Sequence, residues 1–113
     1  MSQPAERLPS ITHLQFLVLG LLLDGPRAGR DIRPELHHHG VRRTAPAFYQ
    51  MMARLEDAGL VEGWYDQKVI DGQMIKERHY RLRPAGARAW AATRDFYLAR
   101  LRVASATEQP ANG

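Results

Sequence analysis

The chain has 113 residues, enough for one domain with its own core, yet small enough that dimerisation would help to stabilise it. It contains no cysteine, which excludes disulfides and thiolate metal sites and fits a reducing cytoplasm. The formal charge of +4 favours an anionic partner, nucleic acid before membrane. The longest apolar run, residues 16–23, is too short to span a bilayer, and no signal peptide precedes it, so a soluble protein is expected.

The first predicted element is an apolar helix. Residues 1–9 contain two prolines and few apolar side chains, so a flexible arm is expected there. Thr12 and Gln15 have the spacing of a capping box, which predicts a helix that begins at this point and ends before Asp24. From Leu14 to Leu23 this helix is apolar around most of its circumference, so it must be covered on more than one side. We expect a second subunit to cover one of these sides.

A second helix is predicted to begin between Gly29 and Asp31 and to end near His38. Pro34 leaves two alternatives open. If Asp31 is the N-cap, the proline lies harmlessly in the first turn, but if the helix begins earlier, the proline lies inside it and kinks it. The run 37–39 consists of three histidines that would point in different directions from a helix end, so no metal site is expected.

The third predicted helix follows a short turn and is bounded by clear signals. Thr44 is a good N-cap, Pro46 is tolerated just inside the start, and Gly59 suits the positive φ at which a helix stops. Four apolar residues recur at helical spacing and should face the core: Phe48, Met51, Met52 and Leu55. Two helices joined by a short turn are typical of a helix-turn-helix, with the recognition helix second.

The pattern then changes to that of a β-hairpin. Residues 60–70 and 74–82 are rich in strand-forming residues, and Asp71-Gly72 between them is a strong tight-turn signal. A hairpin directly after a helix-turn-helix is a wing. Pro84 then begins a last helix that should run to about Val103, and no earlier element remains to cover its apolar stripe, which therefore predicts a subunit contact. A disordered tail is expected over residues 105–113.

These features resemble the short members of the PadR family of bacterial transcriptional regulators, which have a single C-terminal helix. The resemblance covers about residues 14–97. It rests on a leucine-rich first helix and on these segments: 24–26 (DGP), Gly29, 47–49 (AFY), 54–61 (RLEDAGLV), 78–82 (RHYRL) and 85–86 (AG). Pro34 and Arg83-Pro84 depart from the family pattern and bear on local helix geometry.

The resemblance implies a homodimeric winged helix-turn-helix protein that binds a pseudo-palindromic operator and usually represses. It also implies that the C-terminal helix swaps across the dimer and that a planar aromatic effector binds near the dimer interface in some members.

Ten residues are candidates for contacts with double-stranded DNA, on and around the third helix and on the wing. Those expected to meet phosphates or the adjoining surface are Arg42, Arg43, Thr44, Tyr49 and Arg54, and those expected to meet bases are Ala47 and Gln50. The wing candidates are Lys68, Gln73 and Lys76. Two alternatives stay open. Tyr49 could instead be a half-buried core residue, and the lysines of the wing could serve only to keep the protein soluble.

A second set of residues is expected at a homodimer interface: Leu14, Leu17, Leu21, Trp90, Phe96, Tyr97 and Leu101. Of these, the three aromatic residues Trp90, Phe96 and Tyr97 are also candidates for a pocket that binds a small aromatic effector. Plain hydrophobic packing of a dimer helix is the alternative explanation for the same residues.

The sequence therefore predicts an α+β, mainly helical fold: a winged helix-turn-helix with a two-stranded wing and a long C-terminal dimerisation helix. The expected division is an arm (1–9), a DNA-binding domain (10–83), the dimerisation helix (84–104) and the tail (105–113). The predicted function is that of a transcriptional regulator, a repressor that binds an inverted repeat as a homodimer. The alternatives are a winged-helix protein-interaction module and a small-molecule-binding dimer or enzyme. No catalytic motif and no cofactor site is evident.

Overall fold

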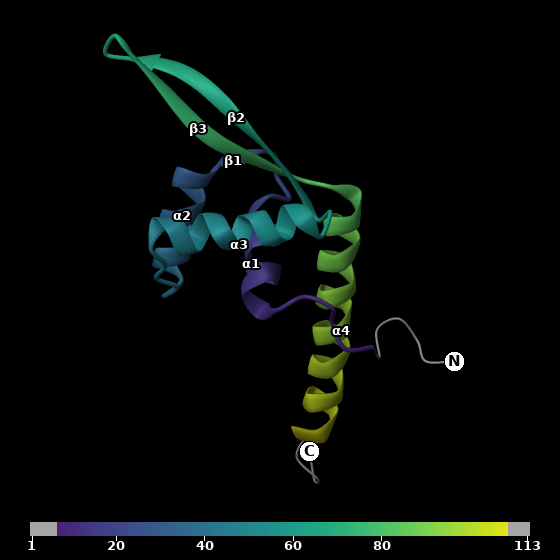
Figure 1. The fold of residues 1–113 in the computed structure, drawn as a ribbon. Coiled ribbons are helices and arrows are strands. Elements are labelled where there is room, and N and C mark those ends of the chain that lie inside the picture. Colours follow the sequence, from purple (N-terminus) through teal and green to yellow (C-terminus); the bar gives the residue numbers. More distant parts are fainter. Residues whose placement is uncertain (1–6, 109–113) are drawn as a thin grey trace.

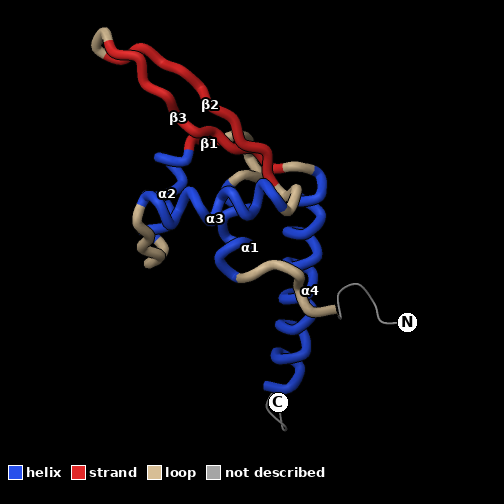
Figure 2. Tube along the Cα trace, in the orientation of Figure 1, coloured by secondary structure: helices blue, strands red, loops and turns tan. Residues whose placement is uncertain are grey.

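The computed structural model describes residues 7–108 of the chain. In chain order the elements are α1 (His13–Leu21), β1 (Arg27–Ala28), α2 (Gly29–His38), α3 (Ala45–Asp57), β2 (Val61–Ile70), β3 (Gln73–Leu82) and α4 (Pro84–Glu108). Helices α1 to α3 form a compact group, from which the β2–β3 hairpin projects in one direction and α4 in another (Figures 1 and 2). The result is an elongated molecule of 70 × 31 × 23 Å, and the predicted α+β winged helix-turn-helix is confirmed.

Two helices begin at the predicted caps. The Thr12 hydroxyl accepts a hydrogen bond from the Gln15 N–H, and the Gln15 side chain accepts one from the Thr12 N–H, which completes the capping box of α1. The Thr44 hydroxyl accepts from the Ala47 N–H at 3.3 Å and caps α3. Helix α3 stops where predicted, because Gly59 takes a φ of +74°.

The first residue of helix α2 distinguishes the two alternatives for Pro34. The helix begins at Gly29, so Pro34 lies inside it rather than in its first turn. Having no N–H, Pro34 gives no hydrogen bond to the carbonyl of Arg30, one turn earlier. Ile32 and Leu36, which flank this position, are fully buried, so packing holds the helix where backbone bonding is incomplete.

The sheet has one strand more than the sequence predicted. Strand β1 has only two residues and pairs with β3, giving a three-stranded antiparallel sheet in the order β1-β3-β2. The hairpin itself has the predicted form, with ten antiparallel pairs from Val61↔Leu82 to Ile70↔Gln73. Asp71 and Gly72 both have positive φ, +51° and +78°, as a two-residue hairpin turn of type I′ requires.

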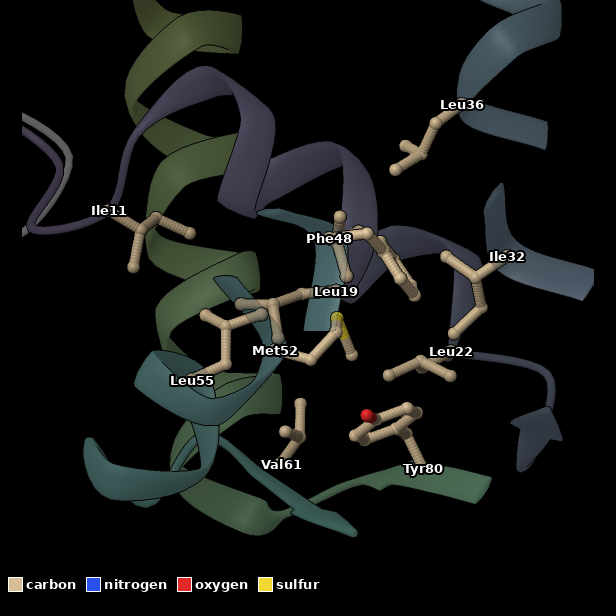
Figure 3. Close-up of a cluster of buried hydrophobic side chains, with 11 residues drawn as sticks. Ile11, Leu19, Leu22, Ile32, Leu36, Phe48, Met52, Leu55, Val61 and Tyr80 are labelled. Carbon is tan, nitrogen blue, oxygen red and sulfur yellow. The ribbon is translucent and has the colours of Figure 1, made fainter. Parts of the chain in front are cut away.

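The core lies where α1, α2 and α3 meet the base of the hairpin (Figure 3). Its buried residues are Ile11, Val18, Leu19, Leu22, Ile32, Leu36, Phe48, Met52, Leu55, Val61 and Tyr80. Members of this cluster come from before α1 to Tyr80 near the end of β3, so the hairpin is anchored in the same core as α3.

Helix α4 differs from its prediction in two respects. It runs to Glu108, so the expected end near Val103 and the disordered tail are wrong for residues 105–108. Its first half is also covered within the chain: the Trp90 ring stacks on Phe16 of α1 with centroids 5.6 Å apart, and the Tyr97 hydroxyl hydrogen-bonds His13 Nε2 at 2.6 Å.

The rest of the expected arm and tail, residues 1–6 and 109–113, lies outside the described residues. Within residues 7–108, no helix combines the length and the apolar character needed to cross a bilayer.

The buried Tyr80 makes stability depend on pH in the alkaline range. Burial raises the pKa of its phenol from 10.0 to about 12, although the neighbouring Arg78 lowers it. The folded state therefore keeps a proton that the unfolded chain loses. This contribution to stability is complete below pH 10 and is lost as the pH rises through 12. Two units of pKa correspond to about 2 to 3 kcal/mol.

We expect the free energy of unfolding in urea to fall more steeply between about pH 10 and about pH 12 in the wild type than in a Tyr80→Phe variant. The variant is the control for every other group that titrates in this range. Equal slopes for the two proteins would show that the phenol of Tyr80 is not shielded from water.

Candidate nucleic-acid interface

Helix α3 buries one side and presents the other to solvent. Phe48, Met52 and Leu55 are fully buried. The side chains expected to meet DNA lie on the rest of its circumference: Tyr49, Gln50 and Arg54 are exposed, and Ala47 is partly buried. Tyr49 retains 37% of its accessible surface, so it is not a core residue.

The N-terminus of α3 carries positive charge. Arg42, Arg43 and Thr44 are all exposed and directly precede the first helical turn, whose unpaired N–H groups give that end a partial positive charge. Arg33 of α2 donates a hydrogen bond from Nη2 to the carbonyl of Arg43 at 3.1 Å. This bond holds the backbone before α3 and leaves the Arg43 guanidinium exposed.

A cavity lies between α3 and the hairpin. Its volume is about 520 Å³, and its lining residues are Tyr49, Ala53, Glu56, Tyr65, Lys76, Arg78 and Tyr80. The four hairpin residues among them occupy one face of the sheet, because opposite partners such as Tyr65 and Arg78 project to the same side. The cavity therefore forms a cleft with α3 as one wall and one face of the wing as the other.

An ion pair crosses this cleft. Arg78 Nη2 lies 2.5 Å from Glu56 Oε1, and the Arg78 guanidinium lies 4.8 Å from the centroid of the Tyr65 ring. Glu56, Tyr65 and Arg78 are not among the residues predicted from the sequence to form the site. Helical and strand periodicity place them on the correct faces, but their meeting depends on the angle between α3 and the wing.

The predicted wing residues are divided between two faces. Lys76 lies in the cleft and has no ion pair within residues 7–108. Lys68 and Gln73 lie on the opposite face, and Lys68 Nζ is 3.7 Å from the buried carboxylate of Glu77. Because the Asp71-Gly72 turn already fixes the register, strand alternation was a sequence signal that would have separated the two lysines.

A second groove lies on the other flank of α3, against α1. It has a volume of about 340 Å³ and brings together four of the predicted DNA-binding residues, Arg43, Ala47, Gln50 and Arg54. Its remaining lining residues are Thr12, Leu14, Gln15 and Met51. The predicted residues thus surround the exposed side of α3 on both flanks, with Tyr49 toward the wing.

The residues predicted for a dimer interface fall into two groups. Leu14, Leu17, Leu21 and Trp90 are partly buried and pack on the core of the same chain. Leu101 is 61% exposed on the second half of α4. The aromatic residues proposed for an effector pocket, Trp90, Phe96 and Tyr97, contact α1 or one another and line neither the cleft nor the second groove.

Comparison with known proteins gives structural neighbours only, since neither a family model nor a curated sequence matches the chain. A PadR-family regulator from Eggerthella lenta shares 26% identity at a TM-score of 0.63, over 86% of this chain and 83% of the other. A PadR-family regulator from Clostridium difficile shares 14% identity at a TM-score of 0.70, over 87% of this chain and all of the other. Bacillus subtilis PadR, solved with operator DNA, shares 22% identity at a TM-score of 0.59, over 71% of this chain and 45% of the other.

The chain has the fold of the PadR-family regulators. The family resemblance inferred from the sequence is therefore confirmed, with the fold as the shared feature. The expectation that the chain is not an enzyme agrees with these neighbours, which are transcriptional regulators. Among residues 7–108 no group of three or more histidine and carboxylate side chains is placed to hold a metal ion.

Proposed function

We propose that the chain is a transcriptional regulator that binds double-stranded DNA as a homodimer, with α3 in the major groove and the wing against the adjacent backbone. The observation that carries this proposal is the exposed side of α3, which begins at an arginine-rich, capped N-terminus and lies beside a wing face bearing Lys76. The B. subtilis neighbour of the same fold was solved with operator DNA. Together these support DNA as the partner.

The cleft between α3 and the wing is placed to receive one strand of a DNA duplex. The major groove and the neighbouring minor groove of a duplex are separated by one sugar–phosphate strand. If α3 enters the first groove and the wing reaches the second, this strand must pass between them, where Lys76 and the exposed Tyr49 and Tyr65 line the cleft. Gln50 and Ala47 then face base edges, and Arg43 meets a flanking phosphate.

Dimerisation supplies the symmetry. A two-fold dimer presents two α3 helices to an inverted repeat, and the second half of α4 offers the exposed Leu98 and Leu101 as apolar contacts. A regulator bound in this way over a promoter would repress by occupying it. A small aromatic effector near Trp90, Phe96 and Tyr97 would release it by changing the angle between the two DNA-binding lobes.

The test of DNA binding is a titration of duplex from the region upstream of the protein's own gene at several salt concentrations, with two matched lysine variants. We expect tight, salt-dependent binding, and we expect Lys76→Gln to reduce the slope of log K against log[salt] by about 0.9, the value for one lost phosphate contact. Lys68→Gln should leave the slope nearly unchanged, because its ammonium lies on the opposite face beside Glu77.

Equal effects of the two variants would contradict the assignment of the cleft. Failure of the wild type to bind duplex at low salt would reject the regulator and favour a winged-helix module that binds protein.

The dimer is tested by sedimentation equilibrium of Leu101→Asp beside Ala92→Asp. Both positions are exposed on α4, but nine residues are two and a half helical turns, so the two side chains point in opposite directions. We expect Leu101→Asp to weaken dimerisation by at least about tenfold, because a carboxylate replaces a buried apolar contact, and Ala92→Asp to have little effect. A wild type that is monomeric at all concentrations would contradict the proposal.

A further inference from the structure

We propose that Glu56 and Arg78 form a latch that fixes the angle between the wing and α3, so that Arg78 is a positioning residue rather than a phosphate contact. This inference rests on the proposed DNA-binding function. A cation in a cleft proposed to face DNA would ordinarily be interpreted as a contact to the phosphate backbone of the DNA.

The guanidinium of Arg78 is held from several sides. Its Nη2 lies 2.5 Å from Glu56 Oε1, and the two side chains are only 25% and 22% exposed. Its Cζ lies 4.8 Å from the centroid of the Tyr65 ring and 5.8 Å from that of Tyr80. A charge-assisted hydrogen bond and two cation–π contacts fix the orientation of the group and neutralise it. Its capacity to bind a phosphate is correspondingly low.

Strand β2 leaves room for this pair at Gly63. A Cβ atom built on Gly63 would overlap with Oε1 of Glu56 and would lie 3.0 Å from Nη2 of Arg78. The φ of Gly63 is not in the left-handed region, so the glycine matters here for the space it leaves to the Glu56 and Arg78 side chains. A larger residue would push the Glu56 carboxylate away from the strand and disturb its bond to Arg78.

The latch acts at the base of a long lever. Gln73, the first residue of β3, lies five positions before Arg78, a length of about 17 Å at the usual rise of a strand. A rotation of about 10° at the latch therefore moves the tip by roughly 3 Å, comparable to the length of a hydrogen bond to a phosphate. On the other face, Glu77 pairs with Arg30 of α2 at 2.8 Å. This second tie keeps the wing attached when the latch is broken.

The sign of the effect of Glu56→Gln distinguishes the latch from a simple charge effect. Removing a negative charge from a surface that faces DNA should tighten binding. If Glu56 instead positions the wing, Glu56→Gln should weaken binding by about fivefold, the scale of one partly buried ion pair, and should leave the salt slope unchanged. The control is Asp57→Asn on the neighbouring, exposed residue, which should tighten binding.

Gly63→Ala tests the same idea without altering any charge, and it should weaken binding by a similar factor. In the free protein, both Glu56→Gln and Gly63→Ala should speed amide hydrogen exchange in residues 65–76 while leaving exchange in α1 and α3 at wild-type rates. The exchange measurement requires no DNA, so it tests the latch even where the wild type fails to bind duplex.

Two outcomes would show that Arg78 contacts phosphate and would overturn the latch. One is tighter DNA binding by Glu56→Gln. The other is a salt slope reduced by about one unit in Arg78→Gln, with amide hydrogen exchange in the wing unchanged. Absence of DNA binding by the wild type would instead overturn the proposed function. Unchanged exchange in both Glu56→Gln and Gly63→Ala would overturn the latch by itself.

Discussion

The structure depends on the burial of one side of α3. Phe48, Met52 and Leu55 lie fully inside a core that also contains Val61 and Tyr80 from the base of the hairpin. Since a helix cannot rotate once three residues on one side are buried, the opposite side is held toward solvent in a fixed orientation. The same core holds the base of the hairpin, so α3 and the hairpin share one rigid support.

The ion pairs determine the orientation of the hairpin, which the core leaves open. Burial determines which side of α3 is exposed, but it does not determine where the far end of a ten-residue hairpin lies. Adjacent residues of β3 are tied in opposite directions, Glu77 to Arg30 of α2 and Arg78 to Glu56 of α3. Two ion pairs on opposite faces therefore hold the hairpin from both sides.

The features predicted correctly from the sequence are those that depend on neighbours along the chain. Thr12, Thr44, Gly59 and the Asp71-Gly72 turn act within a few residues, and each takes the expected conformation. The two-residue strand β1 is too short to show any periodicity, and it exists only because β3 has an edge to pair with.

The site was predictable to the extent that it follows from the periodicity of single elements. The exposed side of α3 follows from its helical period, whereas the Glu56–Arg78 pair joins two residues 22 positions apart and depends on how α3 and β3 pack. The cover that α1 provides for α4 was missed for the same reason: Phe16 and Trp90 are far apart in sequence and meet only in the folded chain.

In the proposed complex, two copies of α3 reach one duplex at a spacing set by the dimer. Hydroxyl-radical footprinting of the protein on its bound duplex measures this spacing directly. We expect two protected segments related by two-fold symmetry, with centres about one helical turn, or roughly 10 base pairs, apart. A single protected segment, or two without a symmetric relation, would contradict it.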